Sequence, residues 1–480
     1  MTSSHNWLHS RPIPAILLGS VIVAGGLGIV GAGTGNDRPS AAGFPEISSG
    51  NYTFSEPLHN AIAAAPEKER AELERFYQAA TFAPVWMQGK SLSSLGEEAV
   101  LVLNAAGTRG LRPQDYTHGL EFFNIDSAEA AARMDVAVTR NLLRLASDVR
   151  FGRLNPGIYA TQHDAEDRKA PLAEVLWGIA HDPGGIEVGF EKLDPPFADY
   201  KRLVAALGHY QALAVSDPSK LAQVGQIERT MERWRWLPHA FHRSPILVNV
   251  PEAQLRALDD SNNVALQMRV VVGQTKTPTP LFTADMTYVI FGPYWNVPSS
   301  ILLKEIVPDI KKDARYLSKN SYEVVDSAGK VVPAEEEVSG ETLAGLQSGK
   351  LRVRQVPGGK NALGRVKFMF PNQNDVYLHD TPSQNTFTRI RRDVSHGCIR
   401  VQKPQELAEW VLRDEEGWTS EMIAAALKET NSQRANIKES IPVFILYHTV
   451  TVDEDGTVHF WPDIYKHDAA LAVQMATARR

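Results

Sequence analysis

The sequence predicts an α+β fold in which a mainly helical first half precedes a β-rich second half. From residue 56 to about 225, apolar residues recur at the three- and four-residue spacing of amphipathic helices. Near residue 240 the pattern changes to short runs rich in Val, Ile and Tyr, bounded by Pro, Gly, Asn and Asp, which is typical of strands. An uncharged apolar stretch at 13–33 predicts a membrane segment ahead of both parts.

Residues 1–34 are predicted to form a signal-anchor or a signal peptide. The stretch 13–33 follows Arg11 and carries no charge. About 20 apolar residues span a bilayer as a helix, whereas a secretory h-region has about 7–15, so an uncleaved anchor fits better than a cleaved peptide. The small residues "VGA" at 30–32 still offer a cleavage site. Both forms predict that the chain is exported.

The composition excludes several classes of function. The net charge of −6 comes from 50 basic and 56 acidic residues that are mixed along the chain. Nucleic-acid recognition needs a basic stripe, so we expect no nucleic-acid partner. The 14 histidines do not fall into a metal-ligand spacing, and H-E-x-x-H does not occur. We therefore expect no metal and no cofactor.

The first half is predicted to hold a linker and a helical domain. Residues 35–55 are rich in Gly, Pro and Ser and predict the linker, and residues 56–225 predict the helical domain. One helix is expected at 66–80, where Pro66 stands at a favourable starting position. A longer one is expected at 127–154, with Ser127 as its N-cap.

The second half, residues 226–470, is predicted to be a β-rich domain with a few helices. Strands are expected at 244–252, 264–274, 285–298, 322–332, 364–370 and 375–380. The segment 441–460 predicts a hairpin that turns at Asp455-Gly456. A helix is expected at 403–414.

Cys398 is the single cysteine of the chain and lies in "SHGC" at 395–398. In an exported protein, an unpaired cysteine is either a small buried hydrophobic residue or a thiol kept for chemistry. His396, Arg400 and a helix expected to begin a few residues later could each favour a thiolate, and Gly397 allows a tight turn. His379 closes the expected strand 375–380, and Cys–His pairing is the usual route to an activated thiolate. These neighbouring residues favour the interpretation that Cys398 is a reactive thiol.

The stretch "VYLHDTP" at 376–382, followed by "SHGCIRV" at 395–401, resembles the active-site signature of L,D-transpeptidases with a YkuD-type catalytic domain. The similarity covers most of the chain from about residue 56. Stretches similar to the long, periplasmic YcbB-like branch lie at 228–238, 271–282, 294–301, 354–372 and 453–468. Others, at 76–87, 107–116 and 148–156, resemble the helical scaffold domain of that branch.

This resemblance implies a scaffold domain at 56–225 and a catalytic domain at 226–470, with a capping subdomain inserted at about 300–350. It also implies a periplasmic protein that is anchored to the inner membrane by residues 13–33, acts on peptidoglycan stem peptides and is inhibited by carbapenem-type compounds. One feature departs from the branch. The segment 198–216 leads almost directly into 228–238, which leaves no room for the small peptidoglycan-binding module that many members carry.

The resemblance further implies a reaction. Cys398 would attack the third residue of a tetrapeptide stem, release D-alanine and pass the acyl group to the third-residue diamino acid of another stem. His379 would be the general base and acid, oriented by the backbone carbonyl of Asp380, while the N–H groups of Gly397 and Cys398 would stabilise the oxyanion. The residues expected to bind substrate are His396, Ser395, Arg400, Tyr377, Asn372 and Trp295.

Two alternatives stay open at this point. A peptidoglycan L,D-carboxypeptidase, or another cysteine hydrolase, would use the same acyl-enzyme with water as the acceptor. A non-catalytic envelope scaffold that binds the cell wall would keep the fold without the reaction.

Overall fold

The computed structural model describes residues 54–120, 125–159, 170–333 and 335–478. The predicted anchor at 1–34 and nearly all of the predicted linker lie outside this part of the chain. Within it, no helix is both long enough and apolar enough to cross a membrane.

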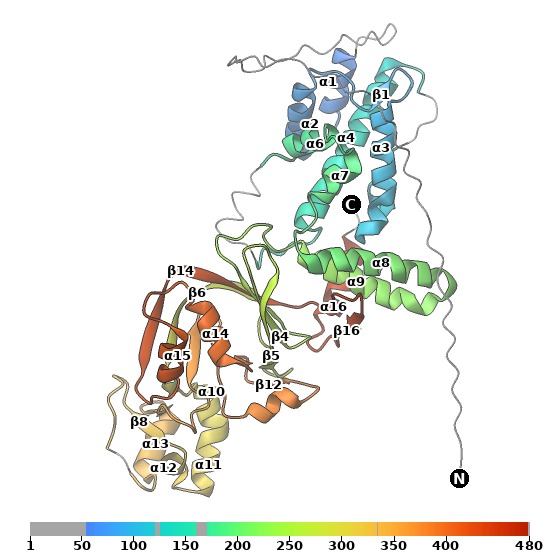
Figure 1. The fold of residues 1–480 in the computed structure, drawn as a ribbon. Helices are drawn as coiled ribbons and strands as arrows, with labels where there is room; N and C mark the ends of the chain where they lie inside the picture. Colours follow the sequence, from blue (N-terminus) through green and yellow to red (C-terminus); the bar gives the residue numbers. More distant parts are fainter. Residues whose placement is uncertain (1–53, 121–124, 160–169, 334, 479–480) are drawn as a thin grey trace, which may run out of the picture. The chain divides into compact units, whose positions relative to one another are not determined.

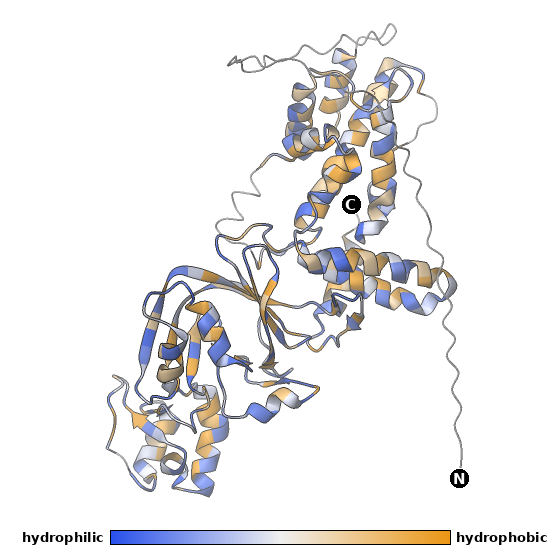
Figure 2. Ribbon diagram, in the orientation of Figure 1, coloured by the Kyte–Doolittle hydropathy of each residue, from blue (hydrophilic) through white to orange (hydrophobic). Residues whose placement is uncertain are grey.

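The first described region is helical, as predicted (Figure 1). Its helices are α1 (Ser55–Ala63), α2 (Glu67–Ala79), α3 (Ser94–Asn104), α4 (Ala128–Phe151), α6 (Leu172–Ala180) and α7 (Ile186–Glu191), with a short ribbon of β1 (Met87–Gln88) and β2 (Ser91–Leu92). Hydrophobic and hydrophilic residues alternate along these helices (Figure 2), and their apolar faces form one core that includes Leu73, Phe76 and Leu142. The predicted helix starts are confirmed, because Pro66 directly precedes α2 and the Ser127 hydroxyl accepts from the Ala130 N–H at 3.1 Å.

Two longer helices pack against the β-rich part. Helices α8 (Ala198–Ser216) and α9 (Leu221–Trp234) share a core with Leu247 and Phe444, which belong to strands of the second half. Helix α16 (His467–Thr477) contributes Leu471 to the same core and continues past residue 470. By packing, α8 and α9 thus connect the helical region to the β-rich part.

The second half contains a sheet that closes on itself. Its strands run in the order β12-β5-β13-β11-β10-β6-β14-β3-β4, and β4 also pairs with β5, so all of them except β12 form a ring. Their bounds are β3 (Ile246–Asn249), β4 (Gln254–Leu258), β5 (Val264–Gly273), β6 (Phe282–Phe291), β10 (Val366–Met369), β11 (Leu378–His379), β12 (Asp393–Ser395), β13 (Ile399–Val401) and β14 (Gln433–Leu446). Helices α14 (Pro404–Val411) and α15 (Ser420–Ala426) lie along the sheet and share its apolar core. The predicted β-rich domain and its helix near 403–414 are confirmed.

Several predicted strands are shorter than expected; the one predicted at 322–332, for example, ends at Val325. Two further elements differ in their course. The stretch 285–298 is not one strand: β6 ends at Phe291, because Gly292 has a φ of +54° and Pro293 cannot donate to a ladder. The hairpin predicted at 441–460 is shorter, since β14 pairs with β6 and β3, and only β15 (Val450–Val452) and β16 (Val458–Phe460) pair across the Asp455-Gly456 turn.

A separate small body interrupts the second half between β6 and β10. It has its own three-stranded sheet, β7 (Trp295–Asn296), β9 (Arg352–Gln355) and β8 (Tyr322–Val325), and its helices are α10 (Ser299–Ile301), α11 (Val307–Lys312), α12 (Tyr316–Lys319) and α13 (Gly340–Ser348). A π-helical turn, η4 (Leu302–Ile306), joins α10 to α11. Its apolar core, which includes Leu302, Ile310 and Val353, is distinct from the core of the main sheet. We call residues 295–355 the cap.

Candidate active site

The candidate site lies on one face of three neighbouring strands, β10, β11 and β13. Successive side chains of a strand point to opposite faces. Phe368, Leu378 and Ile399 occupy one cross-strand row and are fully buried in the core. The next row, Lys367, His379 and Arg400, therefore points to the other face. Cys398 precedes β13 by one residue and falls on the same face as Arg400.

A tight turn between β12 and β13 presents the thiol. Gly397 has a φ of +117°, a conformation that residues with a Cβ rarely adopt. The Ser395 hydroxyl donates to the Cys398 carbonyl at 2.6 Å and accepts from the Gly397 N–H at 3.1 Å. From the other side, the Thr279 hydroxyl donates to the Gly397 carbonyl at 2.7 Å. Ser395 and Thr279 thus fix the turn from both sides.

His379 is held as a neutral base. Its Nδ1 lies 2.6 Å from the Asp380 carbonyl oxygen. A carbonyl only accepts, so Nδ1 carries the proton and Nε2 keeps its lone pair. Burial lowers the pKa of His379 to about 3, and the positive charges of Arg400 and Lys367 act in the same direction, against the Asp380 hydrogen bond. The imidazole is therefore neutral at physiological pH and can accept a proton.

The thiol of Cys398 is half-buried and has no disulfide partner. Its Sγ lies 3.7 Å from the Asp375 carbonyl oxygen. Burial raises the pKa of the thiol, while Tyr377 and Lys367 act to lower it. The resting side chain is thus a thiol, and the neighbours that could favour a thiolate do not produce one at rest, because desolvation outweighs their charges. The expected helix effect is also indirect, since β13 separates Cys398 from α14.

Comparison with known proteins identifies the family of this region. The family description "L,D-transpeptidase catalytic domain" of the YkuD family matches residues 243–437. Residues 243–437 are a YkuD-type L,D-transpeptidase catalytic domain. A second family description, "Scaffold domain", matches residues 71–207, which include most of the helical region.

Two individual proteins extend the comparison. A curated Haemophilus influenzae protein named "Putative L,D-transpeptidase" is 33% identical over 273 residues. That alignment covers 57% of this chain and 53% of the relative, so the chain spans about half the length of the curated relative that it matches. A solved structure entitled "Structure of the Ldtfm-avibactam carbamoyl enzyme" is 12% identical and covers 44% of this chain and 51% of its own, with a TM-score of 0.18, too low to support an argument.

The structure distributes the remaining predicted residues of the L,D-transpeptidase domain differently from the expectation. Tyr377 touches the thiol, and its ring meets that of His379 with centroids 5.7 Å apart. Arg400 shares the row of His379. The Asn372 amide donates to the carbonyls of Phe370 and Val376, both at 2.7 Å, and so braces its own loop.

Three further predicted residues have contacts that the sequence did not indicate. Trp295 is partly buried and packs against the apolar core of the cap. Ser395 is buried and uses its hydroxyl within the turn, which leaves it a structural role. The N–H of Gly397 is already bonded to Ser395, so it is not free for an oxyanion. The Cys398 N–H finds no acceptor among the described residues and is the remaining candidate donor.

Sequence reasoning missed Lys367, Glu305 and Gly364. Lys367 is a charged residue within the otherwise apolar strand β10. A single charge on the face of a predicted strand that does not enter the core was the signal that could have identified Lys367 as a site residue. Glu305 and Gly364 gave no such signal, because their roles depend on contacts with distant parts of the chain.

Among the described residues, one polar contact joins the cap to the turn that holds Cys398. His396 Nε2 lies 2.7 Å from Glu305 Oε1, and both side chains are about half exposed. Glu305 lies in the π-helical turn η4, a type of irregularity that often marks functional sites. The hydrogen bond joins the cap to a residue two positions before Cys398.

We expect Glu305→Gln to loosen this contact. An exposed pair of this kind contributes about 0.2–1 kcal/mol, so hydrogen exchange at 302–306 should rise by up to roughly five-fold. Glu323→Gln is the matched control, because it removes the same charge from a pair with Arg354 that stays inside the cap. Equal exchange at 302–306 in wild type and Glu305→Gln would show that the contact does not hold the cap.

Gly364 supports Asp380 and, through it, the orientation of His379. At Gly364 the φ is +65°, and an added Cβ would lie 2.3 Å from Asp380 Oδ2. We expect Gly364→Ala to lower the free energy of unfolding by more than about 1 kcal/mol, because strain and a clash add together. Gly349→Ala is the control: its φ is +77°, but nothing lies within 4 Å of the added Cβ. Urea unfolding compares the two variants, and equal losses would contradict the clash.

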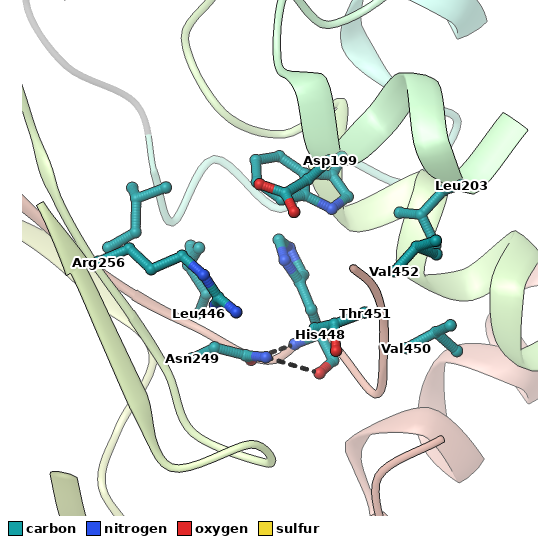
Figure 3. A pocket seen from close by; sticks show the side chains of 11 residues that line it. Asp199, Leu203, Asn249, Arg256, Leu446, His448, Val450, Thr451 and Val452 are labelled. Carbon is teal, nitrogen blue, oxygen red and sulfur yellow. Dashed lines mark hydrogen bonds between the residues drawn. The ribbon is translucent and has the colours of Figure 1, made fainter. Parts of the chain in front are cut away.

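An enclosed pocket elsewhere in the chain is separate from this site (Figure 3). It lies between α8, α9 and the strands β3, β4 and β14, and includes Asp199, Arg256 and His448 in its lining. Asn249 holds the His448 backbone, donating to its carbonyl at 3.0 Å and accepting from its N–H at 2.8 Å. No predicted site residue lines this pocket, so it takes no part in the proposed reaction.

Proposed function

We propose that the chain is a peptidoglycan L,D-transpeptidase that uses Cys398 as a covalent nucleophile. The observation that carries the proposal is the placement of the single thiol on the face of the sheet that also holds a neutral, carbonyl-oriented His379. The match of residues 243–437 to the L,D-transpeptidase catalytic domain supports it.

In the first half-reaction, Cys398 would attack the carbonyl carbon of the third residue of a tetrapeptide stem. The thiol first rotates away from its long, weak contact with the Asp375 carbonyl and gives its proton to His379 Nε2. Because the thiol is protonated at rest, this proton transfer accompanies the attack. The Cys398 N–H would stabilise the oxyanion.

Collapse of the tetrahedral species breaks the peptide C–N bond and leaves a C–S thioester. His379 returns the proton to the departing amine of D-alanine. In the second half-reaction, the side-chain amine of a neighbouring stem's diamino acid attacks the thioester and gives its proton to His379. Collapse of this second tetrahedral species breaks the C–S bond, and His379 returns the proton to the sulfur, which restores the thiol. The new amide links third residue to third residue. Outside the cytoplasm no nucleotide drives bond formation, so the thioester must conserve the energy of the cleaved peptide bond.

Several further parts belong to the same proposal. The segment 13–33 would anchor the protein in the inner membrane with the catalytic domain in the periplasm. The cap would limit access of water to the thioester. Carbapenem-type compounds would acylate Cys398, because they combine a strained amide with a compact shape.

The test is incubation of the purified protein with disaccharide-tetrapeptide, followed by mass analysis of the products. Cross-linked dimers with loss of one D-alanine support the proposal. Tripeptide stems without dimers would identify the hydrolase alternative, and an unchanged substrate would favour the non-catalytic alternative.

A further inference from the structure

Two cations flank His379 in the row that forms the floor of the site. Lys367 of β10 and Arg400 of β13 are the direct cross-strand neighbours of His379 on its two sides. Neighbouring strands are about 4.8 Å apart, so both side chains start within reach of the groups around His379. The Lys367 Nζ lies 3.7 Å from the centre of the Tyr377 ring, and the lysine charge acts on Cys398 to lower the pKa of its thiol.

Neither cation has a charged partner. Both side chains are half-buried, and within the described ranges neither forms an ion pair or donates a side-chain hydrogen bond. Burial lowers the pKa of both groups, and only the thiolate form of Cys398 would act to raise them. Asp375 is the one carboxylate that acts on Lys367 through space, but it forms no ion pair with it. Partly buried cations usually form ion pairs with anionic groups. Two such cations without an ion pair therefore favour the binding of an anionic group of a ligand.

The proposed reaction brings an anion to this place. The leaving D-alanine carries a free carboxylate, whose carbon lies two bonds from the scissile nitrogen, or about 2.5 Å away. The sulfur must contact the carbonyl carbon bonded to that nitrogen. The carboxylate of the donor therefore enters the immediate surroundings of Cys398 whenever the donor is bound productively.

We propose that Lys367 binds the C-terminal carboxylate of the donor stem peptide and positions the scissile bond over Cys398. The inference rests on the proposed function and specifies one part of its substrate recognition. Tyr377 supports the lysine side chain through the face of its ring, which favours a cation. Arg400, on the far side of His379, supplies the second positive charge of the subsite. The requirement for a carboxylate one residue beyond the scissile bond would explain the release of a single terminal residue.

The experiment compares two donors, a tetrapeptide stem that ends in D-alanine and the same stem that ends in D-alaninamide. Release of the two leaving groups is measured by mass spectrometry as kcat/KM, and the acid-to-amide ratio is the readout. Lys367→Met keeps the aliphatic stem and removes the charge, whereas Lys367→Arg restores a charge. Lys403→Met is the matched control, because Lys403 is exposed at the start of α14.

Wild type should prefer the acid by roughly 10- to 100-fold, as expected for a hydrogen bond between charged groups. Lys367→Met should lower this ratio by about ten-fold or more, while Lys367→Arg retains much of it and Lys403→Met leaves it unchanged. Any effect of Lys367 on the thiolate, or of amidation on the leaving amine, cancels in the comparison of the ratios. A wild-type ratio near one, or an unchanged ratio in Lys367→Met, overturns the inference while the transpeptidase proposal stands. If wild type releases neither leaving group, the proposed function falls and this inference falls with it.

Discussion

Replacing Cys398 with Ala is expected to abolish both D-alanine release and cross-linking. Removal of a covalent nucleophile typically costs roughly 10⁴-fold or more in rate, and no other cysteine can substitute. The fold should persist, because Cys398 lies half-buried in a turn that Ser395, Thr279 and Gly397 hold without the thiol. We expect a stability change within about 1 kcal/mol.

Intact-protein mass spectrometry with a carbapenem separates loss of the nucleophile from loss of the fold. Wild type should gain the mass of one inhibitor molecule, and Cys398→Ala should gain none while its urea unfolding stays close to that of wild type. Wild-type dimer formation by Cys398→Ala, or an adduct that survives in it, would refute Cys398 as the nucleophile.

Replacing His379 with Asn is expected to lower the rate of acylation by roughly 10²- to 10⁴-fold, the usual contribution of a general base. The Asn amide can still donate to the Asp380 carbonyl, so the variant tests the lost base and not merely the lost hydrogen bond. Because the thiol pKa is raised by burial and His379 is not among its causes, the alkylation profile of Cys398 should change little. A wild-type acylation rate in this variant would exclude His379 as the base.

The same variant has a signature in the pH dependence of stability. The pKa of His379 is about 3 in the folded protein and about 6.5 in an unfolded chain, so the unfolded state binds a proton that the folded state does not. The free energy of unfolding therefore falls as the pH falls from about 6.5 toward 3. Urea unfolding of His379→Asn should show a shallower decline in this window, and an equal decline would contradict a buried, neutral His379.

The sequence was sufficient to predict the fold class, the helical first half and the identity of the catalytic domain. Periodicity along helices and strands is a local property, so the starts of α2 and α4 could be found at Pro66 and Ser127. The HGC motif and the histidine that precedes it can also be recognised in the sequence without the structure. The roles of Cys398 and His379 could be proposed from those letters, because their residue types limit the chemistry that they can perform.

The tertiary structure decided which polar groups remain free to act. The sequence suggests a role in the site for Ser395, Asn372 and the Gly397 N–H. In the structure, each of these groups forms its hydrogen bonds within its own segment. Lys367 gained its place only through a strand register that sets it beside His379, although twelve positions separate them. Desolvation also depends on the tertiary structure. The protonation states of Cys398 and His379 at rest depend on how deeply other strands bury them, and a local sequence pattern does not show this.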